Sequence, residues 1–132
     1  MRQVFGLKVA RSWEAKYIER KPPYTRTLAV LMAPDTHGVK NLAINMVVVP
    51  PKGKSDVHSH PECEEYWIIV DGRGEMIIEG EKTPVEPGMI VYSPPNSSHQ
   101  MVNTGYEPLK AYFLFAPPGP EKKLLEDIKK EE

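Results

Sequence analysis

Prolines and glycines divide this sequence into short segments. Fourteen prolines and nine glycines are spread over 132 residues, and the segments between them are rich in β-branched and aromatic side chains. Such segments favour β-strands, and many short strands separated by turns are typical of a sandwich or barrel. The sequence therefore predicts an all-β fold. The expected strands are residues 3–10, 26–32, 41–49, 65–70, 74–79, 89–92, 99–103 and 109–116.

Turn-forming residues indicate where the chain reverses direction. Gly72 and Gly74 stand on either side of Arg73, so we expect a tight hairpin there. This hairpin would pair residues 65–70 with residues 74–79 as neighbouring antiparallel strands. Further turns are expected at residues 80–82, 87–88 and 94–96.

The C-terminal segment departs from this pattern. Pro120 suits the first position of a helix. Three apolar residues then recur at helical spacing on one face, Leu124, Leu125 and Ile128. The other positions carry charges of both signs, which is typical of a face exposed to solvent. We therefore expect a short surface helix over residues 120–131.

Length, charge and cysteine content exclude several classes of protein. A chain of 132 residues with 40% hydrophobic positions suffices for a single domain, 1–132, with its own core. Its formal net charge is -1 without blocks of either sign, so nucleic acids and acidic membranes are not expected partners. The apolar runs are far shorter than the roughly 20 residues of a membrane-spanning helix, and no signal peptide is apparent. Because the single Cys63 cannot form an intramolecular disulfide, we expect a cytoplasmic protein.

Three of the four histidines lie in two strand-rich segments. His58 and His60 are two residues apart, so in an extended strand both imidazoles point to the same face and can converge on one ion. His99 lies in the second segment. Glu65 follows a turn at Pro61 that resets the alternation, so the direction of its side chain is not settled by sequence parity.

These two segments resemble the two motifs of the cupin superfamily. The first motif, G-x5-H-x-H-x3-4-E-x6-G, is matched within residues 53–72 by His58, His60, Glu65 and Gly72. The second motif, G-x5-P-x-G-x2-H-x3-N, is matched within residues 88–103 by Gly88, Pro94, His99 and Asn103. The strands of residues 1–50 fit the remainder of the fold by pattern only. The resemblance implies a double-stranded β-helix, or jelly-roll barrel, enclosing a site lined by inward side chains.

Two positions depart from these motifs. Gly53 lies one residue closer to His58 than the first motif asks, and Asn96 stands where the second motif has its middle glycine. Asparagine tolerates the left-handed backbone conformation better than most residues, so we expect this turn to be preserved.

The resemblance also implies one divalent transition metal per chain, held by His58, His60, Glu65 and His99. Imidazole and carboxylate ligands suit Fe, Mn, Ni, Zn or Cu and disfavour Mg and Ca, which prefer oxygen ligands. Four protein ligands on a six-coordinate ion leave positions open for water or substrate. The alternative is a metal-free barrel in which the histidines only form hydrogen bonds.

Glu64 and Cys63 are rival ligands in the first segment. The motif allows three or four residues between the second histidine and the carboxylate, but only Glu65 has the six-residue spacing to Gly72. Cys63 falls in the turn before that strand, and four ligands are already supplied. We therefore expect Cys63 to be a loop cysteine.

Strand alternation predicts which side chains surround this site. Four further residues share a face with the expected ligands, Trp67, Ile69, Met101 and Asn103. We expect them to line the cavity, with the large side chains of Trp67 and Met101 mainly filling it. In the last strand the interior receives one of two sets, Tyr112 with Leu114 or Phe113 with Phe115, and parity alone cannot choose between them.

Polar groups near the cavity restrict what it can hold. Three phenols in these strands are available as a proton donor or base, Tyr66, Tyr92 and Tyr112. Basic residues are scarce, because Arg73 and Lys82 both fall in turns and the motif segments contain no other arginine. A substrate with several phosphates or carboxylates would require arginine forks, so we expect a small, weakly charged molecule.

Two functions follow from the resemblance. Family members with this ligand set include dioxygenases, decarboxylases, lyases and isomerases, which implies a small metalloenzyme acting on a small organic molecule, with its catalytic residues unidentified. The alternative is a non-catalytic module that binds a small molecule or sugar through the metal or the cavity. A polar acid or base beside an open coordination position would favour the enzyme. Under either function the apolar strands of residues 1–50 favour a homodimer.

Overall fold

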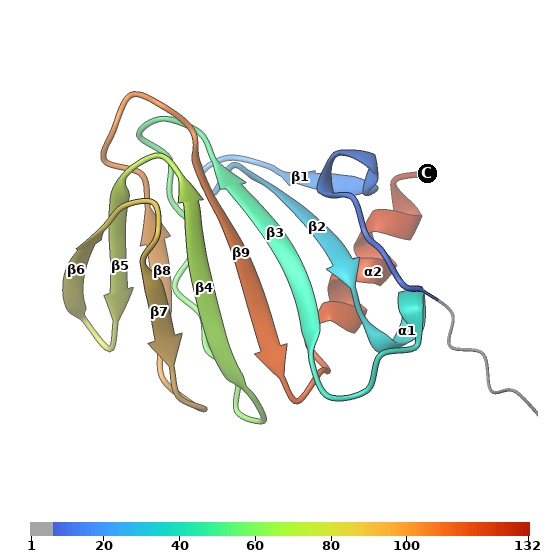
Figure 1. The fold of residues 1–132 in the computed structure, drawn as a ribbon. Coiled ribbons are helices and arrows are strands. Elements are labelled where there is room, and N and C mark those ends of the chain that lie inside the picture. The colour runs from blue at the N-terminus through green and yellow to red at the C-terminus, as the bar shows by residue number, and fades with distance from the viewer. Residues whose placement is uncertain (1–6) are drawn as a thin grey trace, which may run out of the picture.

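Two antiparallel sheets face one another in the computed structural model, which describes residues 7–132 (Figure 1). The larger sheet has the strand order β1-β2-β3-β9-β4-β7 and the smaller one the order β6-β5-β8. The strands are β1 (Tyr17–Arg20), β2 (Arg26–Met32), β3 (Ala43–Val49), β4 (Glu64–Asp71), β5 (Gly74–Ile78), β6 (Glu81–Val85), β7 (Ile90–Ser93), β8 (His99–Val102) and β9 (Leu109–Ala116). The helical segments are η1 (Ser12–Glu14), α1 (Pro34–His37) and α2 (Glu121–Lys130). The predicted jelly-roll class with a short C-terminal helix is confirmed.

The alternation of side chains decides which face of each strand is buried. Along β3 and β9, buried and half-buried residues alternate without a break. In β9, Phe113 and Phe115 are buried, whereas Tyr112 and Leu114 lie on the outer face. The structure thus resolves the choice that parity had left open. Residues 110–115 of β9 are each paired in register with β3 on one side and β4 on the other.

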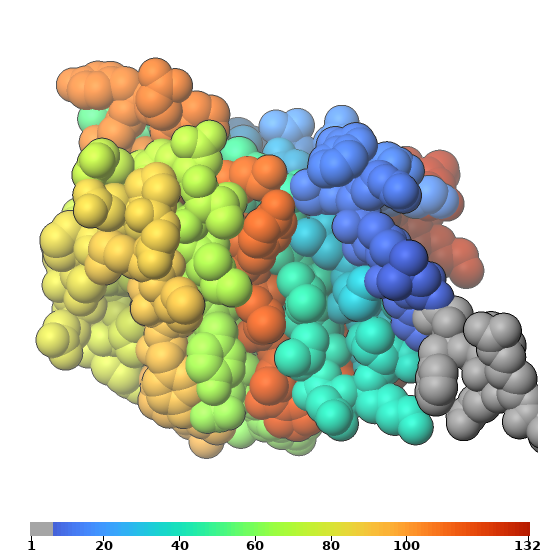
Figure 2. All heavy atoms as spheres, in the orientation of Figure 1, coloured from blue at the N-terminus to red at the C-terminus, as the bar shows by residue number. Residues whose placement is uncertain are grey.

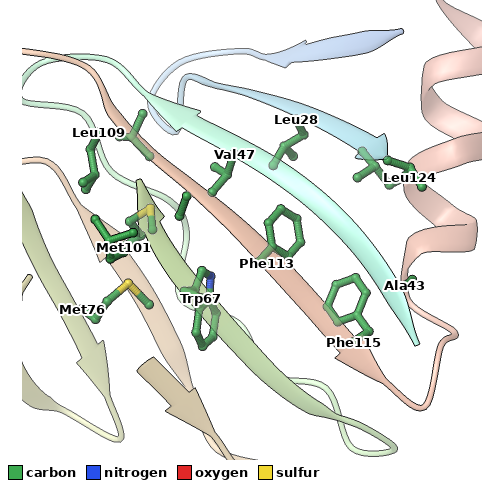
Figure 3. Packing of buried hydrophobic residues seen from close by; sticks show 14 of the residues in the cluster. Leu28, Ala43, Val47, Trp67, Met76, Met101, Leu109, Phe113, Phe115 and Leu124 are labelled. Atoms are coloured by element: carbon green, nitrogen blue, oxygen red, sulfur yellow. The ribbon is translucent and has the colours of Figure 1, made fainter. Parts of the chain in front are cut away.

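The core lies between the two sheets. Trp67 and Phe113 of the larger sheet belong to the same hydrophobic cluster as Met76 and Met101 of the smaller one (Figure 3). Each such side chain contributes about 1.5–3 kcal/mol when fully buried. Helix α2 extends this core by packing Leu124 and other apolar residues against β1 and β2. None of the helices in residues 7–132 combines the length and apolar character needed to cross a membrane.

The hairpin predicted around Arg73 does not form, so this prediction is wrong. Strand β4 pairs with β7 and β9, and β5 pairs with β6 and β8, so the chain crosses between sheets here instead of folding back. A Cβ on Gly72, whose φ is +78°, would lie 2.2 Å from the carbonyl oxygen of Pro108. A Cβ on Gly74 would lie 2.3 Å from the carbonyl oxygen of Val102. These glycines therefore permit a close backbone approach at the crossing.

A two-residue hairpin joins β5 and β6. Ile78 pairs with Glu81, and the two residues between them, Glu79 and Gly80, both have positive φ values. This is the geometry of the two-residue turns that suit the twist of antiparallel strands.

Some short elements differ from the sequence-based expectation. In the predicted strand 3–10, residues 3–6 lie outside the described part of the chain and residues 7–10 form no strand. Strands β1 and β6 and helix α1 were not predicted. β6 contains Pro84, which a central strand would not accommodate, but β6 is the edge strand of its sheet.

Candidate metal centre

Two backbone hydrogen bonds join the two sequence motifs. The amide of His58 donates to the carbonyl of His99 at 3.1 Å, and the amide of His99 donates to the carbonyl of His58 at 2.8 Å. Their ring centroids lie 4.2 Å apart as a result. His60 is tied to the same region, because its carbonyl accepts a hydrogen bond of 3.0 Å from the amide of Asn96. Asn96 has a φ of +68°, so the predicted left-handed turn is confirmed.

The three histidines form one cluster. Each offers a ligand atom, and these atoms lie within 4.8 Å of one another. Glu65 reaches the cluster from β4, with its Oε1 3.3 Å from Nε2 of His99 and 3.5 Å from Nε2 of His60. Two ligand atoms that each lie about 2.1 Å from one ion at right angles are separated by about 3 Å. The observed separations therefore suit a shared ion.

The buried polar atoms of this cluster fit a metal. Glu65 is only 3% exposed, and its Oε1 and the Nε2 of His99 have no hydrogen-bond partner within the described residues. Burial raises the pKa of Glu65 to about 9. Burial, followed by repulsion from neighbouring imidazoles, lowers the pKa of His60 to about 4 and that of His99 to about 3. The histidines are therefore neutral near pH 7, the form in which imidazole binds metals.

The orientation of His58 is set by Asp56, two residues before it in the chain. Nδ1 of His58 lies 3.1 Å from the carbonyl oxygen of Asp56. When Nδ1 carries the proton and donates to this carbonyl, Nε2 is free to act as a ligand. The side chain of Asp56 is held in turn by Arg26 through a hydrogen bond of 2.9 Å.

Glu64, the rival carboxylate, lies on the opposite face of β4. It accepts hydrogen bonds from the hydroxyls of Tyr66 at 3.3 Å and Tyr92 at 2.6 Å. Tyr112 shares this outer face. The three phenols of these strands, Tyr66, Tyr92 and Tyr112, therefore do not line the cavity.

Cys63 is buried beside the cavity but is not part of the histidine cluster. Burial and the neighbouring carboxylates raise the pKa of its thiol to about 11. Because the thiolate is the form that binds metals, this environment disfavours ligation by Cys63.

A cavity of about 630 Å³ opens onto the cluster. This volume lies within the range of small-molecule sites. Trp67 and Met101 line it, as do Phe113 and Phe115, but Ile69 and Asn103 do not. Asn103 has a structural role.

The fully buried Asn103 side chain holds the loop that precedes β9. Its Nδ2 donates to the carbonyls of Val49 at 2.9 Å and Glu107 at 2.8 Å, and its Oδ1 accepts from the amide of Gly105 at 2.9 Å. These bonds connect the end of β3 to the loop between β8 and β9.

The expectation of a cavity poor in basic residues is wrong. Arg20, Arg26 and Lys123 all line it, and they come from β1, β2 and α2, outside the two motifs. The sequence did contain a signal for Arg26. In the strand predicted for residues 26–32, Arg26 is two residues from the inward-facing Leu28, so both side chains point to the same face. The two motif segments do not include this strand.

The chain is similar in sequence to known proteins. Residues 45–115 match the family described as Cupin domain. The uncharacterized protein MJ1618 of Methanocaldococcus jannaschii is 33% identical over 109 residues, which cover 80% of this chain and 86% of that protein. A glucose-6-phosphate isomerase of Pyrococcus abyssi is 30% identical over 116 residues, which cover 80% of this chain and 59% of the isomerase.

The fold is also similar to solved structures. The crystal structure of a predicted oxalate decarboxylase from Thermotoga maritima has a TM-score of 0.75 at 21% identity, covering 84% of this chain and 100% of that one. At this identity the similarity establishes the fold alone.

Proposed function

This chain belongs to the cupin family, and on that premise we propose that it is a metal-dependent enzyme that converts a small organic molecule inside its barrel. One observation carries the proposal. Three imidazoles and a buried carboxylate with unpartnered ligand atoms converge where a cavity of about 630 Å³ opens. An ionised carboxylate is costly to bury without a partner, so Glu65 stays protonated near pH 7 in the metal-free protein, and a bound cation would stabilise the ionised, ligating form.

The ligands of the proposed centre are His58, His60, Glu65 and His99. This mixture of nitrogen and oxygen donors suits a divalent transition metal such as Fe, Mn, Ni, Zn or Cu. A metal bound there would supply a Lewis acid or an oxygen-binding centre. The protein itself holds His58 by its Nδ1 contact to Asp56 and walls the site with apolar side chains such as Trp67.

Metal content of protein purified without a histidine tag tests the centre. We expect about one ion per chain, bound by neutral imidazoles. The double variant His58→Ala, His60→Ala should lose the ion and keep its β-sheet circular dichroism. His37→Ala is the matched control, because His37 lies on α1 outside the cluster. Wild-type protein that takes up no transition metal in titration would contradict the proposal.

The reaction class is the finer part of the proposal. The dioxygenase, decarboxylase, lyase and isomerase types all remain candidates, and the similarity to glucose-6-phosphate isomerase adds weight to isomerisation. Protein reconstituted with Fe or Mn should consume oxygen or convert one member of a panel of organic acids, phenols, diketones and sugar phosphates. His99→Ala should remove that activity, since it deletes an expected ligand.

A binding module without catalysis is the second candidate. It is favoured by the outward position of the three phenols, which removes them as acids or bases from the cavity. Such a module would show ligand-induced thermal stabilisation that rises with ligand concentration, as mass action requires. No product would form with any metal, and this outcome would replace the enzymatic proposal.

We also propose that two copies pair through the outer face of the larger sheet. Half-buried apolar side chains of β3, β9 and β4 adjoin there in register, Ile44 and Tyr66 each opposite Leu114. Figure 2 shows these strands as neighbouring bands across one side of the molecule. Light scattering should give a dimer mass for the wild type, since two-fold pairs are the commonest closed assembly. Met46→Glu should give a monomer and the exposed-loop control Tyr106→Glu a dimer.

A further inference from the structure

Two arginines face each other across the strands that border the cavity. In the β1–β2 pair, Arg20 lies directly opposite Arg26, and both side chains line the cavity. Like charges in directly opposite positions destabilise a sheet. The fold therefore retains an unfavourable pair at the edge of its cavity, where a function for it should be sought.

The carboxylates around this pair do not neutralise all the cations. Arg26 is paired with Asp56 at 2.9 Å. Asp127 is shared, since it contacts Arg20 at 3.0 Å and Lys123 at 2.9 Å. Three cations thus have two carboxylate partners. Glu62 also lines the cavity but makes no ion pair with any of them in the described structure.

Arg26 retains hydrogen-bonding capacity although its side chain is only 12% exposed. A guanidinium has five N–H donors. One Arg26 nitrogen donates to the carbonyl of Tyr24 at 2.8 Å, and another donates to Asp56 at 2.9 Å. The remaining donors have no acceptor within residues 7–132. Burial lowers the pKa of Arg26, against the effect of Asp56, and Arg20 lowers it further. A negative group arriving in the cavity would relieve this repulsion.

The arginine pair lies close to the histidine cluster. Oδ1 of Asp56 is 2.9 Å from the Arg26 guanidinium and 3.6 Å from Nδ1 of His58. A single carboxylate therefore separates Arg26 from the cluster. A small molecule in the cavity can reach both.

We propose that Arg20 and Arg26 form a binding site for one oxyanion group, so that the molecule held in the cavity is a carboxylate or a phosphate ester. The inference rests on the proposed function only in taking this cavity as the substrate site. Guanidinium groups bind carboxylate and phosphate oxygens through paired N–H donors, and such charge-assisted bonds are strong in a partly buried site. The oxyanion end contacts the arginine pair and the remainder of the molecule extends toward the histidines.

Calorimetric titration of metal-free protein tests the site, because a bound metal could itself bind the anion. The probes are inorganic phosphate in one titration and acetate in the other. The anion that binds with the higher affinity identifies whether the site prefers a phosphate or a carboxylate. Binding to the wild type should be saturable, and Arg20→Gln and Arg26→Gln should each weaken it about tenfold or more. Arg73→Gln is the matched control, because Arg73 is exposed, pairs with Glu86 and does not line the cavity. It should bind like the wild type.

Arg26→Lys separates charge from geometry. It keeps the positive charge but loses the planar fork, so its affinity should fall between those of the wild type and Arg26→Gln. Absence of saturable binding to wild-type protein would overturn the inference. So would equal weakening in Arg73→Gln, which would show that the anions respond only to overall charge.

Urea denaturation of Arg20→Gln distinguishes binding from structural support. The substitution removes the like-charge contact and leaves Asp127 paired with Lys123, so the denaturation midpoint should stay unchanged or rise while anion affinity falls. A lower midpoint with unchanged anion affinity would refute the inference.

Metal uptake by Arg20→Gln keeps the two proposals apart, because Arg20 contacts Asp127 and not Asp56. This variant should take up metal like the wild type. If it does and the wild type binds neither anion, the oxyanion site is refuted while the metal centre stands. If the wild type binds anions but no metal, the metal-dependent function fails and the oxyanion site stands.

Discussion

Replacing Glu65 by glutamine in the metal-free protein gives a quantitative test of the site. Burial without a hydrogen bond to Oε1 raises the pKa of Glu65 from 4.5 to about 9. Between pH 4.5 and about pH 9, the Glu65 carboxyl loses its proton in the unfolded chain but keeps it in the folded protein. The contribution to stability is therefore complete below the unfolded pKa and is lost as the pH rises toward the folded pKa.

The size of this loss follows from the linkage of protons to folding. Over the interval from about pH 7 to about pH 8.5, the free energy of unfolding should fall by about 1.4 kcal/mol per pH unit, or about 2 kcal/mol in all. His58, His60 and His99 add little in this interval. Their pKa values are lowered by burial, so they are largely neutral in both the folded and the unfolded chain.

Urea denaturation of chelator-treated and dialysed protein at several pH values measures the effect. Glu65→Gln should give a flat profile over this interval, because the titrating group is gone. Glu64→Gln, on the outer face of the same strand, should keep the wild-type slope. A flat profile for the wild type would show that Glu65 is ionised in the folded metal-free protein and would refute the reasoning.

Three further experiments test individual features. Metal affinity, measured by titration, should fall much more in Glu65→Gln than in Glu64→Gln, and equal losses would mean that the register of β4 is wrong. Gly80→Ala should lower the unfolding free energy by about 1 kcal/mol, because alanine disfavours the φ of +78° although no atom within 4 Å would clash with its Cβ. Gly72→Ala has the same φ and adds a clash with the backbone, so it should lower the unfolding free energy by more than about 3 kcal/mol. Asn103→Ala removes three hydrogen bonds, one buried and two partly buried, and should cost about 3 kcal/mol in urea denaturation. A loss near zero would contradict its role in holding the loop.

Local chemistry in the sequence determined much of the architecture. The alternation along β3 and β9 follows from a side-chain period of two, so the inward positions of each strand could be narrowed to one of two sets. Asn96 adopts the positive φ expected of asparagine in place of glycine. The two-residue spacing of His58 and His60 indicated that both imidazoles share a face, and the resemblance to the cupin motifs added His99, which the structure places in the same cluster.

Tertiary structure alone decided features that depend on contacts between distant segments. The glycines at 72 and 74 have the same local signature in a hairpin and in a crossing between sheets, and only the pairing of β4 with β9 distinguishes the two. The inward direction of Glu65 likewise depends on how β4 starts after its turn. The arginines of β1 and β2 join the cavity because those strands extend the larger sheet past the motifs. A strand's period of two limits where its side chains can point, but which strands become neighbours depends on packing across the whole chain.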